Sequence, residues 1–329
     1  MTEIIAEIGS VHDGSFGNAC KLIKMCSRLG VSTVKFQMHL AEYETTQDAP
    51  SPKYFNSEDR YSYFQRTCFS KHQWSELISL ANKLDISFCC SPFSIEALEL
   101  LIELGVDNIK IASGEITNLP LIEKAAQSAK KLIISSGMSS WVELDSAMRL
   151  ACGKCKQVTL LQCTSEYPCP PEHVGLNVMQ EMRDRYGVKV GISDHTLSIA
   201  APIAAVALGA TVVEKHLTFS RSMYGSDAKN SLEPNEFQEM VRLIREVDTM
   251  LSSPIDKSDL SSFENMKNTF EKSLVAKSNI EAGSILTQDN IAFKKPGTGL
   301  SPSKMDEIVG KKLIAKVSKD YQFKLEDFE

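Results

Sequence analysis

Short apolar segments alternate with helix-length segments eight times over about the first 250 residues, and this alternation restricts the possible folds. The expected strands are 4–8, 31–36, 86–90, 108–111, 132–135, 158–162, 188–192 and 211–215. The expected helices are 19–29, 95–104, 119–130, 141–150, 176–186, 197–208 and 235–251. A further helix is expected to begin after a cap at 70–73, between the second and third strands. Strands joined by single helices must run parallel. The sequence therefore predicts an α/β protein whose main part is a (β/α)8 TIM barrel.

An open, doubly wound sheet is the alternative fold for this pattern. Such a sheet would not normally need eight strands, and no glycine-rich dinucleotide-binding motif follows the first strand. We therefore expect the closed barrel, in which the carboxyl ends of all strands meet at one mouth.

Polar side chains gather where the predicted strands end. They are Glu7, Lys35, Gln37, Ser91, Lys110, Ser113, Glu115, Ser135, Ser165, Tyr167, Ser193, His195 and His216. Any one serine at such a position is as readily explained as a helix N-cap. Thirteen such residues are hard to explain in this way, because charges near a barrel core are costly unless they are paired or used. We expect an enzyme active site at the mouth.

Two of these residues, His195 and His216, close two successive strands. Only one helix joins the two strands, so they must be neighbours and their histidines emerge side by side. The structural alternative is a pair of histidines hydrogen-bonded to backbone groups. Because neutral imidazole is the commonest metal ligand, we expect this pair to bind a metal ion.

Composition narrows the class of protein. The net charge of −6 gives no support to a nucleic-acid partner, and no apolar run approaches the length of a membrane span. The N-terminal segment lacks the basic region of a signal peptide, so we expect a cytoplasmic protein. Nine cysteines, an odd number, indicate reduced thiols. The pair Cys152 and Cys155 is more simply a helix-to-strand turn than a zinc or redox site.

Two parts of the chain lie outside the alternation. Segment 42–69 is rich in Pro, Tyr, Ser and Asp, and its length favours an active-site flap, with a plain surface loop as the alternative. Beyond the barrel domain, 1–251, a Ser- and Asp-rich linker is expected at 252–270. Short strands at 273–276, 284–286 and 291–293 then predict a small β-rich domain at 271–329.

The motifs along the chain resemble one enzyme family. They are AEIGSVHDGS, VKFQ, SPFS, IKIASGE, IISSGM, QCTSEYP, GISDHT, ATVVEKH and SLEP, followed by the tail SLVAKSNIEAG to KKPGTG. Their order is similar to that of the bacterial N-acetylneuraminate (sialic acid) synthase family over almost the whole chain. The resemblance implies a phosphoenolpyruvate-dependent aldolase-type barrel joined to an antifreeze-protein-like (SAF) domain. It also implies a transferase of the EC 2.5.1 type that condenses phosphoenolpyruvate, N-acetylmannosamine and water to N-acetylneuraminate and phosphate.

The resemblance also implies roles for the matching residues. Phosphoenolpyruvate would be held by Lys35, Ser91, Lys110, Ser113, Ser135 and Ser193. His195 and His216 would bind Mn²⁺ or Mg²⁺. The amino sugar would face Glu7, Gln37, Glu115, Tyr167 and Asp227. Glu115 would either transfer protons or only bind sugar hydroxyls, and both roles stay open.

Three departures from the family pattern bear on the substrate. Ser165 stands where some members have Asn, which affects one hydrogen bond to phosphoenolpyruvate. Gly225-Ser226-Asp227 replaces the family's Gly-Pro-Asp. Lys295 stands where bacterial members carry an arginine that reaches the N-acetyl group, and a lysine offers a point charge rather than a planar fork.

Several alternatives follow. Relatives that make legionaminate or pseudaminate share the same motifs, so the acceptor sugar stays open. Another 3-deoxy sugar acid synthase is disfavoured by the C-terminal domain and the histidine pair. A carbohydrate-binding protein without catalysis is the alternative from a different class. The resemblance further implies a domain-swapped homodimer, since a linker of about 16 residues can reach on the order of 50 Å to a neighbouring chain.

Overall fold

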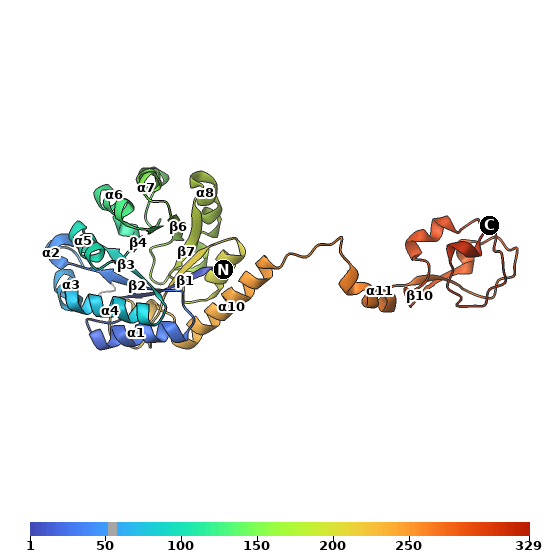
Figure 1. Cartoon of the computed structure of the whole chain (residues 1–329), viewed down its shortest axis with the longest axis horizontal. Helices are drawn as coiled ribbons and strands as arrows, with labels where there is room; N and C mark the ends of the chain where they lie inside the picture. Colours follow the sequence, from blue (N-terminus) through green and yellow to red (C-terminus); the bar gives the residue numbers. More distant parts are fainter. Residues whose placement is uncertain (52–57) are drawn as a thin grey trace. The chain divides into compact units, whose positions relative to one another are not determined.

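The computed structural model describes residues 1–51 and 58–329. They form two compact units, Met1–Ser253 and Pro254–Glu329 (Figure 1). No helix of the described residues is long and apolar enough to span a membrane. All nine cysteines are free thiols.

The first unit is a closed barrel of eight parallel strands that are hydrogen-bonded in chain order. The strands are β1 (Glu3–Gly9), β2 (Thr33–Met38), β3 (Ser87–Pro92), β4 (Asn108–Ile111), β5 (Lys131–Ser135), β6 (Val158–Cys163), β7 (Lys189–Asp194) and β8 (Val212–His216). The strand β1 pairs with both β2 and β8, which closes the ring and aligns Glu7 with Lys35 and with His216. The predicted TIM barrel is confirmed.

Helices surround the strands on the outside (Figure 1). They are α1 (Phe16–Arg28), α2 (Ala41–Glu44), α3 (Arg60–Thr67), α4 (Lys71–Lys83), α5 (Ile95–Glu103), α6 (Leu119–Ser128), α7 (Trp141–Lys154), α8 (Leu176–Tyr186), α9 (Ala200–Ala207) and α10 (Pro234–Ser252). Serine side chains fix several helix starts, with complete capping boxes at Ser70 and Ser140.

The apolar core has two layers. The larger layer lies between the strands and the helices, where residues such as Phe36, Trp74 and Phe237 are buried. A small cluster from β1, β3, β5, β6 and β8 fills the interior of the barrel; its members are Ile5, Cys89, Ile133, Leu161 and Val212. Because inward and outward side chains alternate, Glu7 follows Ile5 on the inner face at the mouth. The inner cluster therefore forms an apolar floor beneath the polar residues of the mouth.

The second unit has its own core around a two-stranded antiparallel sheet, β9 (Ser273–Ala276) and β10 (Ile291–Lys294). Its buried residues are Leu274, Ala276, Ile280, Leu286, Ile291, Ile308, Leu313, Val317 and Phe323. Short 3-10 turns and isolated bridges make up much of the rest. The expected strand at 284–286 is wrong, because only Ile285 forms a bridge there, to Lys312.

Local boundaries also differ from the sequence prediction elsewhere. Helix α9 begins at Ala200 and not at 197, because the Thr196 and Ser198 carbonyls accept hydrogen bonds from the buried Lys215 ammonium group. Segment 42–69 is not a plain loop, since it overlaps α2 and contains α3; residues 52–57 of it lie outside the described part. The segment 252–270 also contains a helix, α11 (Glu264–Phe270).

Candidate active site

The carboxyl ends of the barrel strands surround a cavity of about 420 Å³. Twelve of the residues that the sequence singled out line it. They are Glu7, Lys35, Gln37, Lys110, Ser113, Ser135, Ser165, Tyr167, Ser193, His195, His216 and Asp227. The volume lies in the range of small-molecule sites. Residues far apart in the sequence thus converge on one site.

Three singled-out residues lie elsewhere. Ser91 is fully buried outside the cavity lining, and its hydroxyl has no hydrogen-bond partner among the described residues. Glu115 also lies outside the lining and accepts a hydrogen bond of 2.8 Å from the Asn118 amide. Lys295 belongs to the second unit, where its ammonium group lies 5.1 Å from the centre of the Phe270 ring.

Glu7 is the first centre of a buried charge network. Its two carboxylate oxygens accept hydrogen bonds of 2.6 Å from the Lys35 ammonium group and 2.6 Å from the Gln37 amide. Lys35 and Gln37 are two residues apart on β2, so both point inward, as the period of a strand requires. Burial raises the pKa of Glu7, while Lys35 acts in the opposite direction.

The second centre of the network is Glu214, which the sequence reasoning missed. Its two oxygens each lie 2.9 Å from the Lys110 ammonium group, and one accepts a 3.0 Å hydrogen bond from the Ser193 hydroxyl. The Lys35 ammonium group is 3.5 Å away. Burial opposes ionisation of Glu214, but Lys110 and Lys35 outweigh it and hold its pKa well below the usual value. Its position two residues before His216 could have revealed it, since both side chains share the inner face of β8.

Small residues shape one wall of the cavity. The Gly137 backbone N–H donates a 3.1 Å hydrogen bond to the Ser113 hydroxyl. A Cβ at Gly137 would lie only 2.3 Å from the Ser165 hydroxyl and 2.7 Å from that of Ser113. A side chain at Gly137 would therefore displace these two hydroxyls. This wall therefore brings several polar groups close together, and the space beside them could hold a small anion.

The two histidines lie side by side, with ring centres 5.5 Å apart. His195 Nδ1 lies 2.9 Å from the Thr164 carbonyl oxygen, to which it donates, and this leaves Nε2 for a ligand. His216 Nδ1 is buried and has no partner among the described residues. Burial lowers the pKa of His216 to about 4, although Asp227 acts in the opposite direction. The His216 ring is therefore neutral, with a lone pair available.

Asp227 stands beside His216 at the far end of the long loop after β8. One of its oxygens accepts hydrogen bonds from the Ser10 backbone N–H, at 2.8 Å, and the Ser10 hydroxyl, at 2.7 Å. A Cβ at Gly9 would lie 2.3 Å from this oxygen and 3.4 Å from His216 Cε1. Gly9 has a φ of 49°, so glycine is needed there for conformation as well as space. The neighbouring Asp227 and His216 do not form part of a larger ligand set: among the described residues, no group of three or more His, Cys, Asp or Glu is arranged to hold a metal ion.

Four further lining residues stack in a column, which we call the aromatic column: Arg60, Phe64, His39 and Phe93. The His39 ring lies 3.8 Å from that of Phe64 and 4.1 Å from that of Phe93, centre to centre, with nearly parallel planes. The Arg60 guanidinium covers Phe64 at 5.4 Å. Sequence reasoning missed this column, because its members come from α3 and from the residues that directly follow β2 and β3, and only the fold brings them together.

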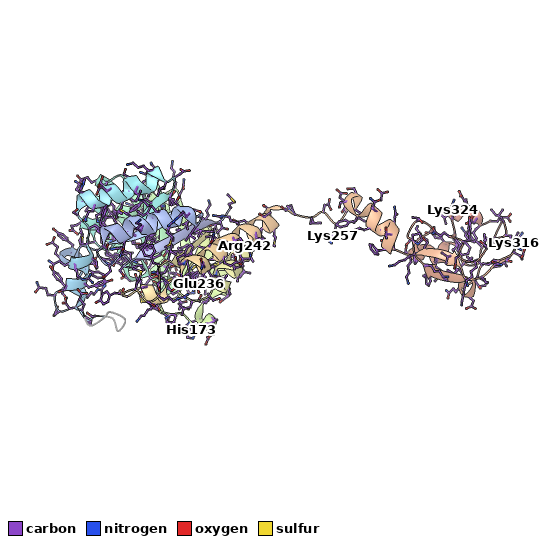
Figure 2. All side chains as sticks on the ribbon, turned by 90° about the horizontal axis from the view of Figure 1, so that it is seen from below. His173, Glu236, Arg242, Lys257, Lys316 and Lys324 are labelled. Carbon is purple, nitrogen blue, oxygen red and sulfur yellow. The ribbon has the colours of Figure 1, made fainter. Side chains whose placement is uncertain are left out.

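Other polar groups near these strands do not reach the cavity. Lys215 and Asp194 form a buried ion pair outside the lining, where Lys215 also donates to backbone carbonyls. His173 lies at the periphery of the barrel and pairs with Glu166 at 2.9 Å (Figure 2). All six histidines lie in the described part of the chain, and three of them, His39, His195 and His216, line the cavity.

Comparison with known proteins places the chain among sugar acid synthases. Residues 22–256 match the NeuB family, and residues 271–329 match the SAF domain. The chain is 40% identical to the N,N'-diacetyllegionaminic acid synthase of Campylobacter jejuni, over 94% of this chain and 95% of that protein. It is 36% identical to human N-acetylneuraminate-9-phosphate synthase, over 96% of this chain and 90% of the human protein.

A solved structure shows the same similarity. The N-acetylneuraminic acid (sialic acid) synthetase of Leptospira borgpetersenii, crystallised with citrate, superimposes with a TM-score of 0.71 at 30% identity. The superposition covers 81% of this chain and 90% of that one.

Proposed function

The chain belongs to the NeuB family, and from this premise we propose that it condenses phosphoenolpyruvate with a 2-acetamido sugar and water. The products would be a nonulosonic acid and inorganic phosphate. The observation that carries the proposal is one cavity in which buried lysines, serine hydroxyls and a histidine pair face the same space. The relatives named above, which are sialic and legionaminic acid synthases, support this class of reaction.

Phosphoenolpyruvate would occupy the deep part of the cavity. Lys35 and Lys110 would neutralise its carboxylate and phosphate, and both are already held in place by Glu214. The hydroxyls of Ser113, Ser135 and Ser165 would add donors around it, and Ser193 would join them once its hydroxyl turns from Glu214 to the ligand. The Ser135 hydroxyl is buried and has no partner among the described residues, so it is free to donate to a ligand. Fixed donors of this kind stabilise charge as it develops.

The histidine pair fits a divalent metal ion. His195 Nε2 and the unpartnered, neutral His216 Nδ1 are imidazole nitrogens, the commonest metal ligands in proteins, and two ligands leave positions for water and substrate. A divalent cation held there, Mn²⁺ or Mg²⁺, would polarise the aldehyde oxygen of the acceptor as a Lewis acid.

The acceptor sugar would lie above phosphoenolpyruvate, near Glu7, Gln37, Tyr167 and Asp227. Carbon 3 of phosphoenolpyruvate would form a bond to the aldehyde carbon, and water would add to carbon 2. The resulting tetrahedral intermediate loses phosphate through cleavage of the carbon–oxygen bond. Glu115 would transfer a proton or bind sugar hydroxyls, and burial raises its pKa, which suits a proton donor.

The legionaminate type of acceptor is favoured over N-acetylmannosamine by the 40% identity to an N,N'-diacetyllegionaminic acid synthase. Lys295 of the SAF domain would reach the N-acetyl group in a domain-swapped homodimer. The cytoplasm is the proposed location, and nine free cysteines agree with a reducing compartment.

The proposal is tested by phosphate release from phosphoenolpyruvate in the presence of each candidate amino sugar, with the product identified by mass spectrometry. Chelation should abolish turnover, and Mn²⁺ or Mg²⁺ should restore it. The variant His195→Ala should keep its fold but lose bound metal, measured by metal analysis of the purified protein. Sugar binding without phosphate release for every acceptor would favour a carbohydrate-binding protein instead.

A further inference from the structure

A second cavity lies at the end of the barrel where the strands begin, opposite the active-site mouth. We call it the amino-end cavity; its volume of about 920 Å³ lies in the range of small-molecule sites. The first residues of β1, β5, β6, β7 and β8 line it. Ile133 and Leu161 of the inner apolar cluster stand on β5 and β6 between the two cavities. A ligand in the amino-end cavity would therefore lie outside the active site.

Three adjacent strands each place one polar side chain in the wall of this cavity. They are Lys131 on β5, Thr159 on β6 and Lys189 on β7. Each stands four residues before a residue that lines the mouth, so the period of a strand puts all three on the inner face of the barrel. Thr159 and Lys189 are direct partners in the ladder between β6 and β7. Because adjacent strands lie about 4.8 Å apart, the three side chains converge on one space.

The charges in the lining of the amino-end cavity are not balanced. Its one carboxylate is Glu3, which accepts hydrogen bonds from the Lys131 ammonium group and, at 2.8 Å, from the Thr33 hydroxyl. Lys156 and Lys189 also line the cavity, and neither forms an ion pair with a carboxylate in the described part of the chain. Two positive charges therefore border the cavity without a partner.

The remaining wall combines one buried hydroxyl with apolar surface. Thr159 is only 3% exposed, and its hydroxyl forms no hydrogen bond with another described residue. Val158, Val188 and Val212 line the cavity as well. Tyr186 is a further lining residue; its hydroxyl donates a 2.9 Å hydrogen bond to Asp145, so it offers a ligand its ring. The cavity thus presents positive charge, a free hydroxyl and apolar groups to the same ligand.

We propose that the amino-end cavity is a second ligand site, which binds a phosphate monoester with an apolar organic group. Such an ester carries about −1.5 to −2 charges near pH 7, which the ammonium groups of Lys156 and Lys189 balance. The Thr159 hydroxyl adds a donor to a phosphate oxygen, and the valines and the Tyr186 ring cover the organic group. The inference goes beyond the proposed function and does not depend on it.

Cys152 provides a local measurement of binding, because its thiol is exposed and it lines the amino-end cavity. The full-length protein is alkylated with iodoacetamide in the presence of phenyl phosphate, and the rate at each cysteine is followed by peptide mass spectrometry. At ten times its Kd, the probe leaves about one-eleventh of the sites free, so alkylation of Cys152 should slow about tenfold. Cys20, on α1, should react at an unchanged rate. Inorganic phosphate should protect Cys152 only at higher concentrations, and phenol should not protect it.

A double variant connects this protection to the two unpartnered charges. Lys156→Gln with Lys189→Gln should raise the phenyl phosphate concentration for half-protection of Cys152 roughly tenfold, as expected for two exposed ion pairs. The matched control is Lys21→Gln with Lys24→Gln, which removes the same charge from the exposed face of α1 and should leave half-protection unchanged. All four lysines are exposed, so both double variants should fold.

Each outcome supports or overturns the inference. Protection by phenyl phosphate that is weakened in the Lys156 and Lys189 variant alone would support it. Absence of protection at millimolar phenyl phosphate, or an equal loss in both double variants, would overturn it. Equal protection by phenol would exclude an anion site, and equal protection by inorganic phosphate would exclude the organic group. The measurement involves no turnover, so failure of the proposed synthase activity would leave this inference standing.

Discussion

Strands β7 and β8 carry two buried sets of charges that face opposite sides of the barrel wall. Glu214 points inward and joins Lys35 and Lys110 in the cavity lining. Asp194 and Lys215, each one residue away from an inward-facing neighbour, pair outside that lining. Both sets are almost fully buried, so burial alone does not distinguish a functional charge from a structural one.

The difference lies in what surrounds each set. Lys215 donates to the Asp194 carboxylate and to the Thr196 and Ser198 carbonyls, so its hydrogen-bonding capacity is used within the protein. The inward set borders open space and lies near Ser135 and His216, whose polar atoms lack partners among the described residues. A buried charge beside unsatisfied groups and a cavity indicates a ligand site. A buried charge with every partner present indicates a structural role.

The largest expected effect is the loss of stability when the Lys215–Asp194 ion pair is broken. Lys215→Met leaves Asp194 buried without its partner, which should lower the free energy of unfolding by about 3–5 kcal/mol. Urea unfolding measures it, with Lys21→Met on the exposed face of α1 as the matched control. The folded fraction should keep its KM for phosphoenolpyruvate. If Lys215→Met had normal stability but a raised KM for phosphoenolpyruvate, the Lys215–Asp194 pair would be functional and not structural.

The next largest effect is expected on catalysis, when the inward-facing Glu214 is replaced. Glu214→Gln removes the carboxylate that holds Lys110 and Ser193, so kcat/KM for phosphoenolpyruvate should fall about 100-fold. Glu239→Gln, on the solvent-exposed face of α10, whose Glu236 and Arg242 are marked in Figure 2, is the control. Partial recovery in Glu214→Asp would support a positioning role. Wild-type kinetics in Glu214→Gln would contradict it.

A buried neutral histidine outside the cavity lining gives a smaller, pH-dependent effect. Burial lowers the pKa of His12 to about 4, and its Nδ1 accepts a 3.1 Å hydrogen bond from the Gly14 N–H. Below pH 6.5 the unfolded state binds a proton that the folded state refuses, so stability falls as the pH drops toward 4. Between pH 7 and 5 this amounts to about 2 kcal/mol. Urea titrations should show a smaller loss in His12→Asn, and an equal loss would exclude His12 as a source.

The smallest effect is expected at Ser91. The resemblance to the synthase family assigns it to phosphoenolpyruvate, but its hydroxyl lies outside the cavity lining and lacks a partner among the described residues. Replacing such a hydroxyl by hydrogen is nearly neutral, so Ser91→Ala should change the free energy of unfolding by less than about 1 kcal/mol. Its Kd for phosphoenolpyruvate should stay within about threefold of wild type. A tenfold rise in Kd would place the hydroxyl on the substrate.

The sequence could predict the barrel because strand alternation and helix caps are local signals. It also predicted which residues lie at the strand ends, since a parallel barrel brings all such ends together. It could not predict that Glu214 pairs with Lys110, 104 residues away, because the pairing depends on β4 and β8 facing each other across the ring. The stacking of His39 between Phe64 and Phe93 likewise requires the placement of α3.

Local hydrogen bonding also overrode the sequence pattern in places. Residues 197–199 have helical composition, yet the Lys215 ammonium group takes the carbonyls that a helix start would use. For Lys295, by contrast, the only signal in the sequence is the family resemblance, and within the second unit its ammonium group lies over the Phe270 ring.

The most direct test of the account measures phosphoenolpyruvate binding by calorimetry in Lys110→Met and Lys215→Met, each in the presence of Mn²⁺. The inward variant Lys110→Met should raise Kd at least about 100-fold, because a buried charge that we propose to contact the substrate is lost. The outward variant Lys215→Met should bind with the wild-type Kd at a temperature where it is folded. Unchanged binding in Lys110→Met, or an equal loss in both variants, would contradict the claim that the inward charges form the phosphoenolpyruvate site.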